Sequence, residues 1–341
     1  MTDQDREAQN DYLWDGTGVP DEAIVRLETT LRRLRHRGSL PRLPAREPGI
    51  RSRAWLSGRW LAAAAAVVVL IAGGAWLAIV FRSTAWRVSS LAGAPAVDGR
   101  VVTDRARMSR GEWLETDNAS RARIAVGGIG SVEVEPNTRL QLVANSREHH
   151  MALDRGIIHA RIWAPPKLFF VATQAATAID LGCAYTLQVD ARGDGMLRVT
   201  HGWVGLERDG RATYIPEGAV CPTRTDRGPG TPRYEDAPSG YGEALMILDF
   251  APPTDPRRAA SLDLVLSTAR RRDALTLWHL LTRGSREERE RVYDRLATLA
   301  PPPGGVTRDL VLAGDRLALD RWWDWLGIET SAWWRLLKKK W

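Results

Sequence analysis

The chain has 341 residues, with 48 Lys and Arg against 41 Asp and Glu and a formal net charge of +7. Most of the cations are interleaved with acids, whereas binding to a phosphate backbone needs clustered cations, so the composition argues against a nucleic-acid partner. There are two cysteines and no CxxC motif, which excludes a multi-cysteine zinc site and a disulfide-rich scaffold.

Residues 1–37 contain one predicted helix. Acidic residues stand at its start, Gly38 ends it, and apolar residues recur at spacings of three and four. An isolated helix of about four turns is marginal, because helices in proteins are stabilised mainly by packing an apolar face. We therefore expect a short cytoplasmic segment whose apolar face packs on a partner, on its own Trp14 or on the membrane. The candidate partner-binding residues are Trp14, Ile24, Leu27, Leu31 and Leu34.

A basic linker, residues 38–59, leads to an uncharged run at residues 60–81. These 22 residues, as a helix rising about 1.5 Å per residue, are long enough to cross a hydrocarbon layer of about 30 Å. Nine arginines and one carboxylate lie between Arg32 and Arg59, so the positive-inside rule places the N-terminus in the cytoplasm. The charged segment before the run is too long for a signal peptide. We expect a retained single-pass anchor in the lipid bilayer.

Beyond the anchor, residues 82–250 change to a period of two. Val132 and Val134 alternate with Glu133 and Glu135, and similar runs are separated by Gly, Pro, Asn and Asp turns. This pattern predicts a mainly-β antiparallel domain, closed as a sandwich or roll or built as a β-solenoid.

Residues 251–341 return to a helical period after the Pro- and Gly-rich stretch 228–232, which reads as a connection. Ser285 and Glu288 form a capping box that opens one of several helices. A small all-α C-terminal domain is predicted. Its tryptophans either fill the core or, with Lys338–Lys340, form an interfacial helix; the first reading assigns Trp322, Trp325 and Trp333 to the core.

Candidate chemical sites have simpler explanations. Histidines are the best metal candidates, but neighbours on a strand point to opposite faces, which favours surface histidines. Carboxylates near strand ends are explained by turn chemistry. No GxSxG motif is present, and neither an enzyme nor a cofactor is expected. Both cysteines follow the predicted anchor and so lie on the exported side, where they are candidates for a disulfide. The alternative is that they are two small buried side chains. The histidines are His149, His150 and His159, the carboxylates are Asp154, Asp180, Asp190 and Asp194, and the cysteines are Cys183 and Cys221.

An ordered series of weak motifs follows the anchor. It runs from Trp113-Leu114 through residues 132–140, 153–156 and 169–173 to Val199–Val204. Over residues 111–206 the chain resembles the periplasmic domain of FecR-like proteins, the membrane-bound regulators of extracytoplasmic-function sigma factors. The resemblance implies a non-enzymatic transmembrane signal transducer in the bacterial inner membrane, with a periplasmic C-terminus. It also implies a sigma factor as cytoplasmic partner and an envelope or outer-membrane signalling protein as a second partner.

The sequence departs from this family on the cytoplasmic side. The family has a small multi-helix anti-sigma domain, whereas one clear helix precedes the linker here. An alternative function is therefore a membrane-anchored periplasmic binding or scaffold module for an envelope protein or a polysaccharide. In that case the N-terminal segment only sets the topology.

Overall fold

The computed structural model describes residues 22–32, 85–145 and 148–328. The chain divides into two compact units, Met1–Ala66 and Val67–Trp341, which are described separately. The first contributes helix α3, Glu22–Leu31. None of the helices in the described ranges combines the length and the apolar character that a membrane crossing requires. The predicted anchor at residues 60–81 lies outside these ranges.

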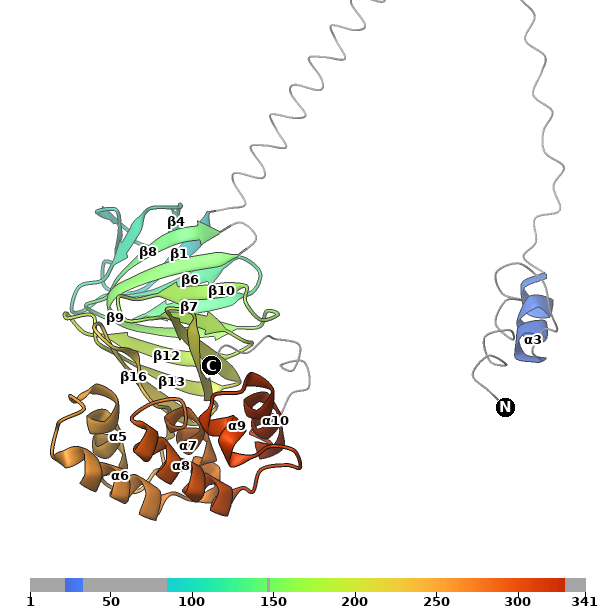
Figure 1. The fold of residues 1–341 in the computed structure, drawn as a ribbon. Coiled ribbons are helices and arrows are strands. Elements are labelled where there is room, and N and C mark those ends of the chain that lie inside the picture. Colours follow the sequence, from blue (N-terminus) through green and yellow to red (C-terminus); the bar gives the residue numbers. More distant parts are fainter. Residues whose placement is uncertain (1–21, 33–84, 146–147, 329–341) are drawn as a thin grey trace, which may run out of the picture. The chain divides into compact units, whose positions relative to one another are not determined.

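The second unit begins with a β domain in two sheets (Figure 1), which confirms the mainly-β prediction. The strands of one sheet are β1 (Trp86–Ala92), β4 (Arg105–Met108), β6 (Arg121–Val126), β7 (Gly130–Val134), β12 (Ala184–Val189), β13 (Gly195–His201), β16 (Ala219–Arg224), β17 (Gly228–Pro229) and β18 (Arg233–Tyr234). The strands of the other are β2 (Ala96–Val97), β3 (Arg100–Val101), β5 (Trp113–Glu115), β8 (Arg139–Asn145), β10 (Phe169–Ala172), β11 (Thr177–Asp180), β14 (Trp203–Arg208) and β15 (Arg211–Pro216).

One long strand, β9 (His149–Ile162), belongs to both sheets. Its first half pairs with β8 and β10, and its second half pairs with β7 and β12. Gly156 stands where the strand changes sheet, with φ of 105°, and a Cβ there would lie 2.2 Å from Thr138 Oγ1. Because β9–β10 is the one parallel ladder among the described strands, the pairing fits a sandwich or roll and not a solenoid.

The core of the β domain lies between the sheets. Ile124 and Val126 of β6 and Val132 and Val134 of β7 are fully buried, while the residues between them face outward. The alternation read from the sequence is therefore the alternation of buried and solvent-facing side chains, as a pleated strand with one covered face requires.

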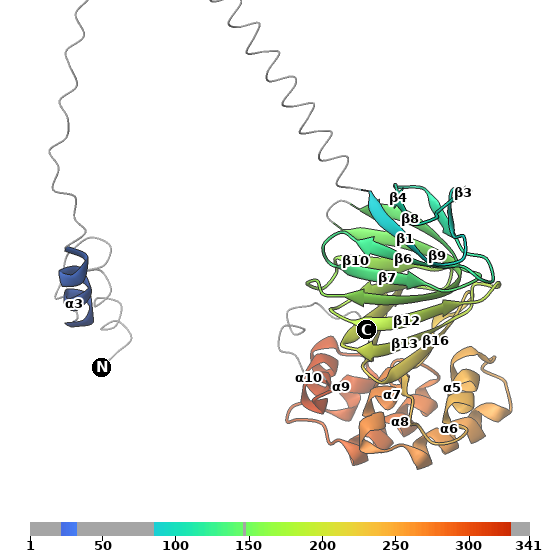
Figure 2. The same cartoon turned by 180° about the vertical axis from the view of Figure 1, so that it is seen from behind.

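The C-terminal region is helical, as predicted, and gathers at one end of the β domain, beyond β13 and β16 (Figure 1 and Figure 2). Its elements are α5 (Tyr241–Phe250), α6 (Arg257–Thr268), the 3-10 turn η2 (Arg271–Asp273), α7 (Ala274–Leu280), α8 (Arg286–Leu299), α9 (Arg308–Leu312) and α10 (Arg316–Leu326). Helix α8 opens with the predicted capping box of Ser285 and Glu288.

Two expectations about this region are corrected. The first concerns its start: α5 occupies residues 241–250, which the sequence reading assigned to the β domain. The run is mostly apolar, and a short apolar run without alternating polar residues shows no periodicity that distinguishes a helix from a strand. The second concerns the tryptophans: Trp322 and Trp323 are buried, whereas Trp325 is 65% exposed and Trp333 lies outside the described residues.

The helices share one hydrophobic core with the β domain and do not form a separate core. Trp323 of α10 contacts Trp203 of β14 and Tyr214 of β15, with ring centroids 6.3 and 6.4 Å apart. The stretch 228–232 is part of this packing and not a free connection. Thr231 is fully buried, its N–H donates to Asp249 Oδ2 at 2.6 Å, and its hydroxyl donates to Asp249 Oδ1 at 2.7 Å.

Candidate functional site

Helix α3 presents an exposed apolar face. Leu27 and Leu31 are 64% and 51% exposed, and Ile24 is half-buried. At 100° per residue these three positions fall on one side of the helix. An exposed ion pair, Arg26–Glu22 at 3.7 Å, lies away from this face. The helix therefore brings together three of the five predicted docking residues, while Trp14 and Leu34 lie outside the described ranges.

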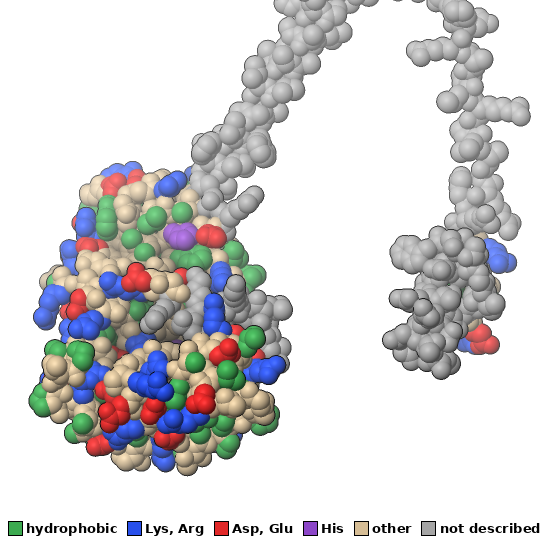
Figure 3. Space-filling view, viewed as in Figure 1, with side chains coloured by type: hydrophobic (Ala, Val, Ile, Leu, Met, Phe, Trp, Pro, Cys, Tyr) green, Lys and Arg blue, Asp and Glu red, His purple; other side chains and the backbone are tan. Residues whose placement is uncertain are grey.

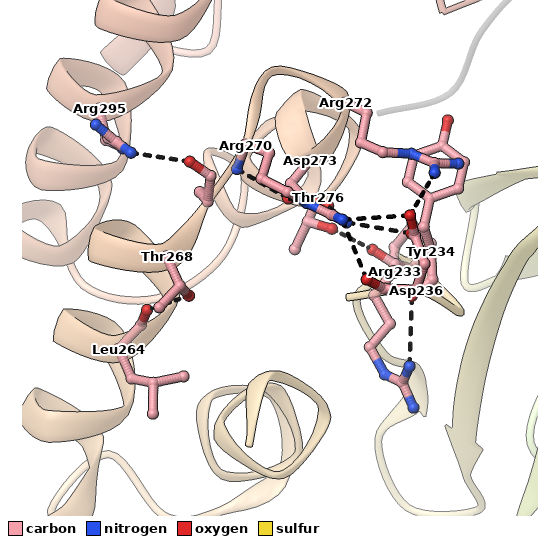
Figure 4. A network of polar contacts seen from close by, with 12 residues as sticks. Arg233, Tyr234, Asp236, Leu264, Thr268, Arg270, Arg272, Asp273, Thr276 and Arg295 are labelled. Atoms are coloured by element: carbon pink, nitrogen blue, oxygen red, sulfur yellow. Dashed lines mark hydrogen bonds and ion pairs between the residues drawn. The ribbon is translucent and has the colours of Figure 1, made fainter. Parts of the chain in front are cut away.

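The junction between the β domain and the helices is held by a network of charged groups (Figure 4). Arg270 donates to both carboxylate oxygens of Asp273, at 2.8 and 3.1 Å, and to Asp236, at 3.1 to 3.2 Å. Arg272 adds a bond to Asp236 at 2.6 Å and stacks on Tyr234. The hydrogen bonds that Arg270 donates to Asp273 and Asp236 raise the pKa of its guanidinium group. Asp236 follows the last strand and Asp273 precedes α7, so the network ties the end of the sheet to the helices.

A second feature of the junction is a cleft of about 670 Å³ between the β14–β15 hairpin and helices α5 and α7. Its charged lining comes from both parts of the unit: Arg208, Asp209 and Arg227 from the β domain, and Asp249, Arg258 and Arg283 from the helices. Sequence reasoning missed this site, because its residues are separated by up to 75 positions and share no motif.

The arginines in the cleft are engaged in structural bonds. Arg283 donates to the carbonyl of Pro229 at 2.9 Å, to Thr213 Oγ1 at 3.0 Å and to the buried Asp249 at 3.3 Å. Arg258 forms two bonds to Glu288, at 3.0 and 3.1 Å. Arg283 therefore fastens the helices to the strands, whereas Arg258 joins α6 to α8, so both guanidinium groups in the cleft have a stabilising role.

Cys183 and Cys221 are separate buried thiols, so the candidate disulfide is not formed in this structure. The Cys183 thiol donates to Asp180 Oδ1, whereas the Cys221 thiol donates to the carbonyl of Gly230 at 3.2 Å. Asp180 also accepts from the backbone of Gly182 at 3.1 Å, which is the expected turn chemistry. Burial raises the pKa of Asp180 to about 6 and raises the pKa of both thiols, so neither thiol is activated as a nucleophile.

The histidines weighed as metal ligands serve other contacts. The rings of His149 and His150 point apart, as strand geometry predicts: one lies 5.6 Å from Trp86 and the other stacks on Phe170 at 4.4 Å. His159 Nδ1 bonds to a threonine hydroxyl at 2.8 Å. Among the described residues, no group of three or more His, Cys, Asp or Glu could hold a metal ion.

Comparison with known proteins found no sequence match, and comparison of structures found distant neighbours. No protein-family model matches the sequence, and no curated protein matches it either. Two crystal structures of a candidate anti-sigma factor from Parabacteroides distasonis, at 1.65 and 2.50 Å resolution, resemble it at 13% identity and a TM-score of 0.32. The match covers 39% of this chain and 64% and 63% of the two neighbours, under two thirds of their length. A likeness at this level does not show a shared fold.

Proposed function

We propose that the protein is a single-pass membrane regulator that relays a signal from a periplasmic β domain to a cytoplasmic partner, a sigma factor. The observation that carries the proposal is the exposed apolar face of α3, which no residue in the described ranges covers. Such a face, with anchors at Ile24, Leu27 and Leu31, is the surface that helix-in-groove recognition uses.

The organisation of the chain supports the same function. A short helix precedes the predicted anchor, and the resemblance to FecR-like proteins follows it, in the order that a transmembrane regulator requires. The described residues from 85 onward form one packed body, in which the β domain and the helices share a core. The predicted anchor is joined to this body through β1, which starts at Trp86. Binding of a partner to the β domain or to the helices is therefore transmitted to the anchor through that strand.

Co-purification from membranes tests the proposal. Full-length protein and a variant lacking residues 11–38 are isolated in parallel, and the captured proteins are identified by mass spectrometry. We expect a sigma factor with the full-length protein and none with the variant. Absence of a sigma factor from both samples would reject the proposal.

One observation favours a second candidate function, a periplasmic binding module on a membrane anchor. The junction cleft is of the size that small-molecule sites have. Under this alternative, removing residues 11–38 changes no binding property of the protein, and the partners captured from cells are envelope components.

A further inference from the structure

The edge of the β domain at which the chain enters from the predicted anchor carries an exposed tryptophan. Trp163 directly follows β9, and its side chain, 77% exposed, is the most exposed of the large apolar side chains in the described ranges. Its backbone N–H donates to the carbonyl of Ile129 in the β6–β7 turn at 2.8 Å, so the exposed ring stands on a fixed backbone. The indole of Trp163 is therefore presented to solvent at a defined place on this edge of the domain.

The strand registers place Trp163 at the same edge of the sheet as the start of β1. Ile162 lies opposite Gly130, the first residue of β7, and Ala125 near the end of β6 lies opposite Arg87. The ends of β6 and β9 and the starts of β1 and β7 therefore form one edge of the sheet. Three strand spacings of about 4.8 Å each separate β1 from β9, which gives a distance of about 14 Å along this edge.

Cations line the outer face of the sheet along the same edge. Arg107, Arg87 and Arg161 fall in one register row, all three exposed, and none forms an ion pair with a described residue. The next row away from the edge is different, because Arg123 there pairs with Glu133 at 2.8 Å. Three unpaired arginines thus stand in the row nearest the chain entry, whereas the next row holds one, Arg105, beside the Arg123–Glu133 pair.

The loop after Trp163 adds to this charge. Lys167 is exposed and also forms no ion pair within the described part of the chain. One carboxylate lies nearby, that of Glu148, whose Oε2 is 2.9 Å from His150 Nε2. Elsewhere the surface differs: Figure 3 shows Lys and Arg interspersed with Asp and Glu over the helices at the bottom of the view. We call Trp163, Arg87, Arg107, Arg161 and Lys167 the entry edge.

The length of chain before the described residues identifies what faces the entry edge. The predicted anchor ends at Phe81, and the described chain resumes at Ala85. Four residue steps span at most about 14 Å, so the start of β1 is held close to the bilayer surface. Indole rings favour the headgroup region, and exposed Lys and Arg are attracted to anionic headgroups within about a Debye length.

We propose that the entry edge lies against the membrane, with the Trp163 ring in the interface and the four cations facing anionic lipid headgroups. The inference rests on the proposed membrane anchor and adds an orientation to it. The β domain meets the bilayer along one sheet edge, and the helices, at the far end of the domain, point away from the lipid (Figure 1). A signalling partner approaching from the periplasm then meets the helical end.

Spin-label accessibility tests the orientation on full-length protein in vesicles containing phosphatidylglycerol. A nitroxide is attached at Trp163→Cys and, as the matched control, at Leu317→Cys, which is 73% exposed on α10 at the helical end. Wild-type protein serves as the labelling blank, because Cys183 and Cys221 are buried. We expect collisions with oxygen relative to a water-soluble nickel chelate to be at least threefold more frequent at position 163 than at position 317. In neutral vesicles, or with Arg87→Glu and Arg161→Glu, the difference should shrink.

The outcomes separate the two proposals. Resistance of the protein to alkaline extraction from the vesicles tests the anchor by itself. If the protein is anchored and the label at position 163 is as accessible to the chelate as the label at 317, the orientation is wrong and the anchor stands. If the protein is washed from the vesicles, the proposed anchor fails as well.

Discussion

Replacing Arg270 with alanine should destabilise the whole second unit of the chain. Asp273, whose side chain is 0% exposed, would lose both guanidinium bonds and keep only the backbone N–H of residue 270 as a donor at 2.8 Å. Removing one partner of a buried ion pair costs about 3–5 kcal/mol, because the remaining charge is left uncompensated. The Arg270 side chain is 38% exposed, so water can enter at the site, and we expect about 3 kcal/mol.

The neighbouring residue provides the control. Arg271 is exposed and no hydrogen bond or ion pair of its side chain to a described residue is found, so Arg271→Ala should change the free energy of unfolding by less than about 0.5 kcal/mol. Thermal unfolding of the full-length protein in detergent, followed by tryptophan fluorescence, should show Arg270→Ala about 6–12 °C below wild type. Equal midpoints for the two variants would refute the view that this network joins the helices to the sheet.

Three further predictions concern the packed unit. Burial raises the pKa of Asp180 to about 6 from 3.8, so the folded state binds the extra proton and the free energy of unfolding falls as pH rises between about 4 and 6. With (6 − 3.8) × 1.36 the fall is about 3 kcal/mol, and urea titrations at several pH values should show Asp180→Asn lacking it; parallel pH profiles would contradict this. Gly156→Ala should cost well over 2 kcal/mol, because its Cβ would lie 2.2 Å from a threonine hydroxyl, whereas Gly210→Ala, also at positive φ but in open space, should cost about 1 kcal/mol in the same assay. Trp323→Ala should cost about 3–5 kcal/mol and the exposed Trp325→Ala little, and similar melting temperatures for these two variants would count against a shared core.

The strands with alternating residues were predictable, because each has one covered and one solvated face. Val132 and Val134 are an example: the pattern fixes which side is buried before any partner strand is known. The pairing of strands was not predictable in the same way. The switch of β9 between sheets depends on Gly156 passing close to Thr138, and no local pattern indicates which distant residue a glycine will approach.

The candidate sites were predictable to different degrees. The face of α3 follows from its helical spacing alone, since Ile24, Leu27 and Leu31 recur within one short segment. The junction cleft does not, because Arg208 and Arg283 come together only through tertiary packing. The exposure of Trp163 was likewise hidden, since its position just beyond β9 is known only once that strand's register is set.

The most direct test of the central claim measures sigma-factor binding by point variants of α3 in the full-length protein. Leu27→Asp with Leu31→Asp places charge on the proposed docking face. Val25→Asp is the matched control: Val25 is also exposed, at 45%, but faces about 160° away from Leu27 around the helix. We predict that the double variant co-purifies at least tenfold less sigma factor than wild type and that Val25→Asp binds as wild type does. Undiminished binding by the double variant, or no sigma factor with wild type, would contradict the account.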